Sequence, residues 1–193
     1  IPVDIGITPG SGPGHLSLFG YDPTVYEIGR GVLEVLGLNM DLQDGDLAAR
    51  ANFCTVRDGV VIDRRAGRIE TKETERLCAL ISQAIPEIEG VKLIIRPGKS
   101  HRFAIIFRGG HLSDKLTDAD PHKDNRPVAY SSPKSAEAEF SSILTNTFIK
   151  KVQELLKDEK VANGVLLRGF SVKPDIPTFT TRYKMNALAI ATY

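Results

Sequence analysis

The chain contains no tryptophan, few other aromatic residues and almost no net charge, and these shortages exclude several classes of protein. Its 193 residues include 25 basic and 24 acidic side chains, which gives a formal net charge of +1. Proteins that bind nucleic acid without sequence preference carry a clear basic excess. Aromatic residues, which would stack on bases, make up only 7% of the chain. We therefore expect no nucleic-acid partner.

Cysteines and long apolar stretches are also scarce. Two cysteines, Cys54 and Cys78, are too few for the disulfide framework of a small secreted protein, so we predict a reducing cytoplasm. No stretch approaches the roughly 18 apolar residues that cross a bilayer, so we expect no membrane association. No signal peptide opens the sequence, which begins with Ile1 rather than Met, and we expect a piece of a longer protein.

The apolar pattern in the middle of the chain predicts strands and helices in the order β-β-α-β-β-α-β. Asp58-Gly59 is a strong hairpin signal between two of the strands. A helix is predicted to begin at Thr71 as its cap, and a longer one at Ser132-Pro133. The strands are predicted at residues 47–56, 60–62, 91–95, 103–107 and 165–167. A hairpin-linked sheet with helices packed on it is an α+β sandwich.

The two ends of the chain differ from the middle. Alternating apolar residues at 1–7 predict a strand that leads into a glycine-rich turn at 8–14. Asp22-Pro23 predicts a helix start, with an interruption at 29–31 and an end at Gly37. One more strand is predicted at 188–191.

Ser11 is the first candidate for chemistry. It lies in the string P-G-S-G-P-G, where a strand-to-helix turn can expose a hydroxyl beside the free N–H groups of a helix start. A nucleophilic serine needs activation by a base or a metal. The pattern by itself favours the simpler interpretation, a serine that caps a turn.

Two further patterns are weaker. Gly98-Lys99-Ser100 resembles the end of a phosphate-binding loop, but Leu93 stands where that loop requires glycine and a strand follows, so we reject it. A polar loop over 109–131 contains carboxylates and imidazoles that could hold a divalent cation. A solvated loop with Asp118 and Asp120 capping turns is the favoured interpretation. The residues in question are His111, Asp114, Asp118, Asp120 and His122.

Cationic side chains gather at the predicted strand ends and predict a shared anion site. Guanidinium groups bind carboxylate and phosphate oxygens through two parallel hydrogen bonds. Ordinary surface charge is the alternative. The candidates are Arg64, Arg65, Arg68, His101, Arg102, Arg108 and Arg168.

Long strings in order along the chain resemble the archaeal-type cofactor-independent phosphoglycerate mutases of the alkaline phosphatase superfamily. They are P-G-S-G-P-G-H-L-S-L-F-G-Y-D-P, G-R-G-V-L-E-V-L-G, A-N-F-C-T-V-R-D-G-V-V-I-D-R-R-A-G-R-I, H-R-F-A-I-I-F-R-G, L-S-D-K-L-T-D-A-D-P-H, A-N-G-V-L-L-R-G and I-P-T-F-T-T-R-Y. Together they span nearly the whole sequence.

The resemblance implies an enzyme of glycolysis or gluconeogenesis that interconverts 2- and 3-phosphoglycerate through a phosphoserine intermediate. Its phosphatase-like core would hold two divalent metal ions (Mn, Mg or Zn). Ser11 matches the nucleophile and would also be a metal ligand. Substrate phosphate and carboxylate would be held by Arg64, Arg65, Arg68, His101, Arg102 and Arg168. Residues 1–37 would belong to the core, 38–172 to an inserted substrate-binding domain, and 173–193 to the linker and strand that return to the core.

The sequence departs from the family pattern in ways that bear on activity. The carboxylate cluster that opens the family's sequences and the Asp/His cluster that closes them supply most metal ligands, and both are absent. We therefore expect this chain alone to bind no metal and to be inactive. Gly12-Pro13-Gly14 also stands where the family has Asp-Thr-Ala. Two alternatives remain open: a related phosphotransferase of the homoserine kinase type, and a non-catalytic anion-binding module. The oligomeric state is open as well.

Overall fold

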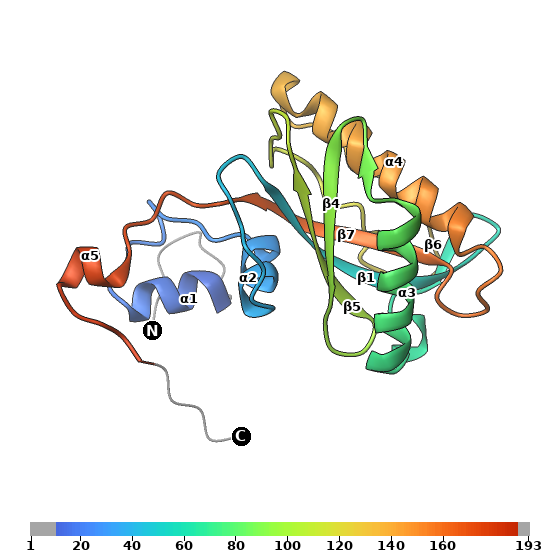
Figure 1. Ribbon diagram of the computed structural model, residues 1–193, viewed down its shortest axis with the longest axis horizontal. Coiled ribbons are helices and arrows are strands. Elements are labelled where there is room, and N and C mark those ends of the chain that lie inside the picture. Colours follow the sequence, from blue (N-terminus) through green and yellow to red (C-terminus); the bar gives the residue numbers. More distant parts are fainter. Residues whose placement is uncertain (1–10, 189–193) are drawn as a thin grey trace. The chain divides into compact units, whose positions relative to one another are not determined.

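A computed structural model describes the fold over residues 11–188, without the side chain of Ser11 (Figure 1). The described residues form two compact units. One comprises residues 11–27 with 174–188, and the other residues 28–173. The strand expected at 1–7 lies outside the described residues. Of the strand expected at 188–191, only Leu188 is described, and it is not in a strand. No helix within residues 11–188 is long and apolar enough to cross a membrane.

The larger unit is built on an antiparallel sheet with β1 (Leu47–Arg57) at its centre. β5 (Arg102–Arg108) and β7 (Gly164–Val172) pair with the two edges of β1, and β2 (Val60–Asp63) pairs with its end through the predicted hairpin. β4 (Val91–Pro97) lies beyond β5. Two short strands, β3 (Glu87–Ile88) and β6 (Arg126–Pro127), complete the sheet.

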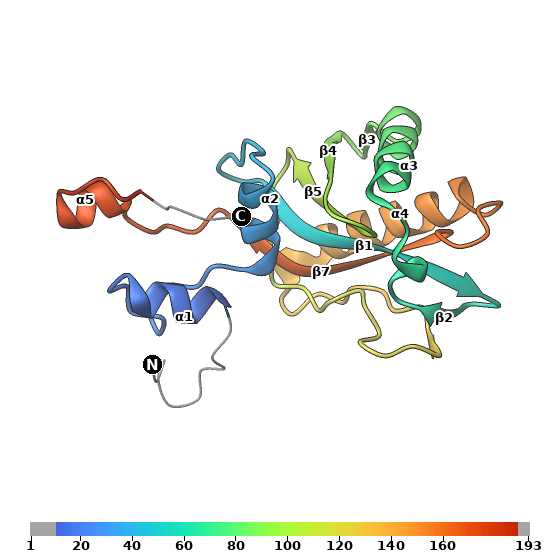
Figure 2. The ribbon, with the colours of Figure 1, turned by 90° about the horizontal axis from the view of Figure 1, so that it is seen from below.

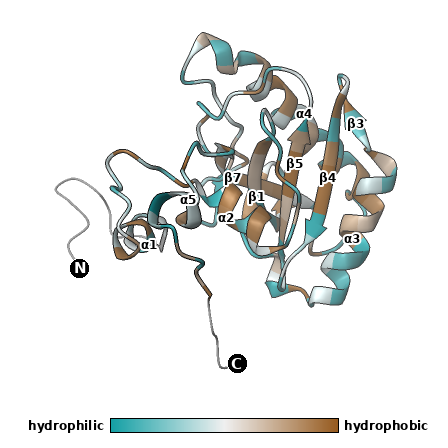
Figure 3. Ribbon diagram, turned by 60° about the vertical axis from the view of Figure 1, so that its left-hand side comes forward, coloured by the Kyte–Doolittle hydropathy of each residue, from teal (hydrophilic) through white to brown (hydrophobic). Residues whose placement is uncertain are grey.

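Two helices, α3 (Thr71–Ala84) and α4 (Glu139–Leu155), cover one face of this sheet (Figures 1 and 2). The predicted α+β class is confirmed, with the predicted element order apart from the two short strands. The core between sheet and helices is formed by side chains of alternating strand positions, as the two-residue period of a strand requires. On β1 these are Leu47, Ala49, Ala51 and Phe53. Figure 3 shows β4 and β5 as largely apolar strands.

The opposite face of the sheet is only partly covered. α2 (Arg30–Gly37) packs Val32 and Val35 against Ala48 of β1 and against Ala104 and Ile106 of β5. A second small cluster lies farther along the sheet, formed by Cys54, Val61 and Leu166. Between the two clusters, this face of the sheet carries polar and charged side chains.

α2 approaches the sheet closely because its second residue is glycine. A Cβ on Gly31 would lie 2.5 Å from the carbonyl oxygen of Ala48 and 2.7 Å from that of Gly169. The Ser171 hydroxyl accepts a hydrogen bond from the Val32 amide at 3.0 Å. The predicted interruption at 29–31 is therefore the start of the helix.

Two predicted helix starts and one predicted helix cap are wrong. Asp22-Pro23 forms a single turn, in which the Asp22 carboxylate accepts a hydrogen bond from the Thr24 amide at 2.8 Å. Pro133 lies in a β-bridge with Leu116, and α4 begins only at Glu139, after the short 3₁₀ turn η2 (Ala136–Ala138). α3 does begin at Thr71, but the side chain of this residue does not cap the helix.

The structure rotates the buried stripe of α4 from the one that helical spacing predicts, which consists of Phe140, Ile143, Leu144, Phe148, Val152, Leu155 and Leu156. Phe140 is 38% exposed and Ile143 62% exposed, although both were expected in the core. Leu144, Phe148 and Val152 are buried as predicted.

The smaller unit contains α1 (Ser11–Leu18) and α5 (Phe179–Tyr183). The Tyr21 hydroxyl donates to the carbonyl of Pro177 at 2.9 Å, and the Tyr183 hydroxyl donates to that of Phe19 at 2.9 Å. These bonds join its two chain segments. Residues 12–14, predicted as a turn, lie within α1.

Candidate anion-binding site

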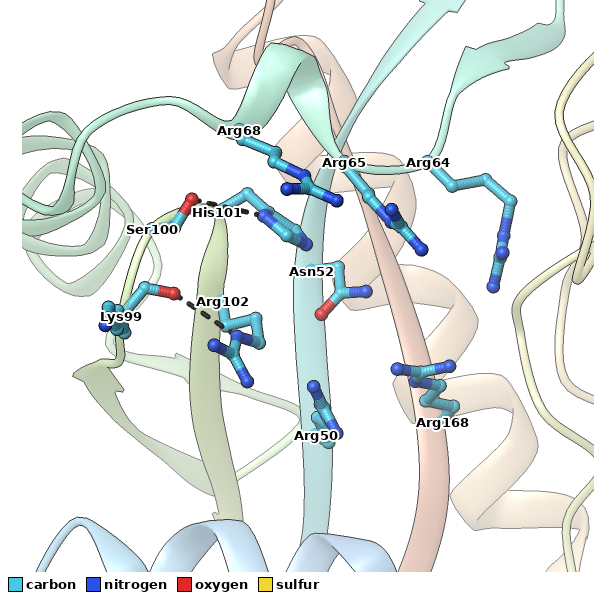
Figure 4. A pocket seen from close by; sticks show the side chains of 10 residues that line it. All are labelled: Arg50, Asn52, Arg64, Arg65, Arg68, Lys99, Ser100, His101, Arg102 and Arg168. Atoms are coloured by element: carbon cyan, nitrogen blue, oxygen red, sulfur yellow. Dashed lines mark hydrogen bonds between the residues drawn. The ribbon is translucent and has the colours of Figure 1, made fainter.

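A cavity of about 410 Å³ lies on the partly covered face of the sheet, in the larger unit (Figure 4). It brings together the six residues to which the resemblance assigned substrate binding, out of the seven cationic candidates named from the sequence. It also contains four residues that the sequence analysis did not assign to this site. The ten lining residues are Arg50, Asn52, Arg64, Arg65, Arg68, Lys99, Ser100, His101, Arg102 and Arg168.

Three adjacent strands form the floor of the cavity. Arg50 and Asn52 alternate with the core residues of β1, so their side chains lie on the face opposite α3 and α4. Arg168 of β7 is the register partner of Arg50, and Arg102 of β5 is the register partner of Asn52. Figure 4 shows these four side chains standing on neighbouring strands.

A left-handed turn after β2 supplies the next three arginines. Ala66, Gly67 and Arg68 have φ values of 47°, 62° and 55°. Non-glycine residues adopt this conformation at a cost of roughly 1–2 kcal/mol each, and such strain is concentrated at functional sites. The Asp63 carboxylate holds the turn by accepting hydrogen bonds from the Arg65 amide at 2.8 Å and the Gly67 amide at 2.6 Å.

The turn between β4 and β5 closes the opposite side. The Ser100 amide donates a hydrogen bond to the Thr71 hydroxyl at 3.1 Å. The Ser100 hydroxyl donates one to the Ile69 carbonyl, also at 3.1 Å. Thr71, predicted as a helix cap, therefore anchors this turn. Lys99 and Ser100 line the cavity without forming a phosphate-binding loop, because β5 follows them and no helix does.

Asp120 is the buried counter-ion of the site. It accepts two hydrogen bonds from Arg64, at 2.7 and 2.6 Å, and its Oδ2 lies 3.9 Å from Nη1 of Arg168. Burial raises the pKa of this carboxyl, but hydrogen bonds from Arg64 and from the His122 amide outweigh burial and leave the pKa lowered. The hydrogen bond with Asp120 also raises the pKa of Arg64. Both arginines are thus oriented before any ligand arrives.

The loop over 109–131 binds the sheet through its carboxylates. Asp118 accepts a hydrogen bond from the Gly169 amide at 2.8 Å, and Asp120 caps a turn at His122 while it is buried beneath the arginines. Across residues 11–188, no three His, Cys, Asp or Glu side chains come together as a metal site would require. The described residues therefore do not fit the two divalent ions that the resemblance implies.

The cavity carries a strong excess of positive charge. Seven of its ten lining residues are arginine or lysine, and none of the ten is a carboxylate. Burial, followed by the nearby Arg102 and Arg65, lowers the pKa of His101 to about 4, so its imidazole is neutral at neutral pH. Burial also lowers the pKa of Arg168, and Arg50 adds to this effect. An anion in the cavity would relieve this repulsion.

Two of the sequence candidates lie elsewhere. Arg108 forms an ion pair with the buried Asp46 at 2.7 Å and a longer one with Asp41 at 3.6 Å, and it does not line the cavity. Its assignment to the shared anion site is wrong. Ser11 is the first residue of α1 in the smaller unit, and its side chain is outside what the structure describes.

Comparisons with known proteins identify the family of the chain. Residues 1–162 match the family of 2,3-bisphosphoglycerate-independent phosphoglycerate mutase. The whole chain is 51% identical to a probable enzyme of that name from Thermotoga sp. (strain RQ2), of which it covers 48%. It is 49% identical to one from Aquifex aeolicus (strain VF5), of which it covers 49%. The chain therefore spans about half the length of the curated relatives it matches.

A solved structure has the same fold. The cofactor-independent phosphoglycerate mutase from Thermoplasma acidophilum DSM 1728 is similar with a TM-score of 0.73 and 38% sequence identity. The similarity covers 89% of this chain and 49% of that one.

Proposed function

Because the chain belongs to the family of 2,3-bisphosphoglycerate-independent phosphoglycerate mutases, we propose that the whole protein interconverts 2- and 3-phosphoglycerate. The reaction is an isomerisation, and we place it in glycolysis or gluconeogenesis in the cytoplasm. In this proposal the chain supplies the nucleophile, Ser11, and the cavity that holds the substrate.

The observation that carries the proposal is the cavity with seven cationic side chains and no carboxylate in its lining. A phosphoglycerate has a phosphate and a carboxylate separated by a short carbon chain. Guanidinium groups bind both kinds of oxygen through paired hydrogen bonds. A cavity of about 410 Å³ suits a small polyanion of this kind.

The proposed reaction has two phosphoryl transfers. In the first, the Ser11 oxygen forms a bond to phosphorus while the bond from phosphorus to the glycerate oxygen breaks, and the proton that the Ser11 hydroxyl gives up replaces phosphorus on the glycerate oxygen. In the second, the oxygen of the other glycerate hydroxyl forms a bond to phosphorus while the bond from phosphorus to the Ser11 oxygen breaks, and the proton of that hydroxyl returns to Ser11. Between the two steps the glycerate must turn without escaping, and the arginines of the cavity would retain it by its carboxylate.

The metal requirement that the family implies is assigned to side chains outside the described part. The carboxylates of the cavity region are already engaged: Asp120 by arginines, Asp118 and Asp63 by backbone amides. We propose that the ions, whether Mn, Mg or Zn, are bound by the longer enzyme together with Ser11.

The experiment is to trap the phosphorylated intermediate. Full-length protein is mixed with 3-phosphoglycerate, quenched during turnover and analysed by peptide mass spectrometry. We expect phosphate on Ser11. Ser11→Ala should abolish both the modification and turnover, while Ser17→Ala on the same helix should leave the modification in place. Phosphate on another side chain, or unchanged turnover in the Ser11 variant, would refute the nucleophile assignment.

A non-catalytic anion-binding module is the second candidate, because the cavity is complete within the unit that lacks Ser11. An assay that couples 2-phosphoglycerate formation to enolase separates the two functions. Turnover supports the mutase. Binding of 3-phosphoglycerate without turnover in metal-supplemented full-length protein would favour the binding module.

A further inference from the structure

The floor of the cavity contains two side chains that were assigned no role from the sequence, Arg50 and Asn52. We propose that Arg50, Asn52 and Arg168 form a subsite for the hydroxy-acid end of the substrate. The two guanidinium groups would bind the carboxylate, and the Asn52 amide would accept a hydrogen bond from the neighbouring hydroxyl. This inference rests on the proposed function. It adds that the floor of the cavity binds the carboxylate and the hydroxyl of the phosphoglycerate.

The register of the sheet places the three side chains together. Arg50 and Asn52 are two positions apart on β1, so they share one face of the strand. Arg168 of β7 lies directly across from Arg50. Like charges directly opposite each other on neighbouring strands destabilise a sheet. A planar carboxylate between the two guanidinium groups would turn this repulsion into attraction.

All three side chains contain a buried atom that lacks a hydrogen-bond partner within the described chain: Nε of Arg50, Oδ1 of Asn52 and Nε of Arg168. Arg50 forms an ion pair with Glu34 at 3.5 Å through the same Nε, but this contact is not a hydrogen bond. Asn52 is only 5% exposed, so its Oδ1 faces the cavity and not the outer surface. Leaving a buried polar group unsatisfied costs roughly 1–3 kcal/mol. These atoms point to a ligand that supplies both acceptors and a donor.

A hydroxy acid has this combination of groups. Its carboxylate offers acceptors to the two arginines, and its hydroxyl offers one donor. Among the neutral lining side chains, Ser100 already donates its hydroxyl to the Ile69 carbonyl. Asn52 adds an acceptor on the sheet between the cationic groups. Inorganic phosphate, which also carries acceptors and one O–H donor at neutral pH, is the competing ligand, and it lacks the carboxylate by which the test separates the two.

The test compares two ligands that differ in one hydroxyl, 3-phosphoglycerate and 3-phosphonooxypropanoate. Binding is measured by calorimetry on full-length protein treated with a chelator, so that turnover does not interfere. A site built to bind a hydroxyl discriminates strongly against its absence, so we expect wild type to prefer 3-phosphoglycerate by about tenfold or more. Asn52→Leu should reduce the preference to below about twofold, because leucine offers no acceptor.

Arg50→Gln should weaken the binding of both ligands by about tenfold or more, since both contain the carboxylate. Arg57→Gln is the matched control, because Arg57 is an exposed residue on the same strand and does not line the cavity. It should bind both ligands as wild type does. Inorganic phosphate, which has no carboxylate, should lose less affinity in Arg50→Gln than 3-phosphoglycerate does.

Asn52→Asp keeps an acceptor at this position and should keep the preference for the hydroxylated ligand, with weaker binding of both. If Asn52→Leu does not fold, the ligand preference of Asn52→Asp decides whether an acceptor at this position binds the hydroxyl. The subsite is refuted if wild type binds both ligands equally, if an acceptor-free variant retains the preference, or if Arg50→Gln binds like Arg57→Gln. If wild-type protein does not bind 3-phosphoglycerate at all, the proposed function itself fails.

Discussion

Replacement of Asp120 by asparagine should destabilise the larger unit strongly, because this carboxylate is the buried counter-ion of two arginines. Its side chain is fully buried, whereas that of Arg64 retains 19% exposure. The substitution preserves the shape of the side chain but removes its negative charge. The carboxylate accepts hydrogen bonds from Arg64 at 2.6 and 2.7 Å and lies 3.9 Å from the guanidinium group of Arg168.

The magnitude follows from what remains buried after the change. Removing one partner of a buried ion pair costs about 3–5 kcal/mol, because the other charge is left uncompensated. Arg64 keeps some contact with solvent, so we expect the lower end, about 3 kcal/mol. For a unit of this size, each kcal/mol corresponds to about 2–4 °C in Tm, which gives a decrease of about 6–12 °C.

Thermal unfolding monitored by circular dichroism measures this effect, with the exposed Asp158→Asn as control. The sign of its pH dependence is also fixed. The pKa of Asp120 is lowered by folding from its ordinary 3.8, so the folded state binds its proton less readily than the unfolded state. The stability difference between wild type and Asp120→Asn should be complete above pH 3.8 and disappear as the pH falls through the lowered value. Equal Tm values for the Asp120 and Asp158 variants would refute the reasoning.

Three shorter predictions concern other parts of the larger unit. Gly31→Ala should cost about 1–3 kcal/mol in the free energy of unfolding, because its Cβ would meet backbone atoms of the sheet, whereas Gly37→Ala, in open space, should cost far less in the same denaturation experiment. His101 should titrate at about pH 4 in NMR spectra, and bound phosphate should raise that value by stabilising the imidazolium. Cys54 and Cys78 should not react with a thiol reagent until the protein unfolds, because burial raises the pKa of both thiols.

The strands were predictable because their side chains follow simple rules. Period-two alternation marks β1, and Asp58-Gly59 occupies the hairpin turn that those residue types favour. The helix starts were less predictable, since local capping signals compete with tertiary contacts. At Ser132-Pro133 the chain forms a bridge to Leu116, and α4 begins six residues later than its Pro signal indicated.

The candidate site was predictable where cations followed strand ends. Arg64, Arg65 and Arg68 directly follow the second strand of the predicted hairpin, so this cluster was recognisable from the sequence. Arg108 looked equivalent but is bonded to Asp46, and only the fold reveals that partner. Lys99 and Ser100 were not considered for the anion site once the phosphate-binding loop had been rejected. A residue can line an anion site without belonging to a known motif.

Arg50 and Asn52 illustrate a signal that was present in the sequence but not interpreted. They replace apolar residues at alternate positions of an otherwise buried strand, between Ala48 and Cys54. Polar residues in such positions cost stability unless a partner satisfies them. In this sheet Glu34 pairs with Arg50 at 3.5 Å, but Nε of Arg50 and Oδ1 of Asn52 have no hydrogen bond to any described residue. Two polar residues at alternate positions of an otherwise apolar strand face therefore indicate a ligand site.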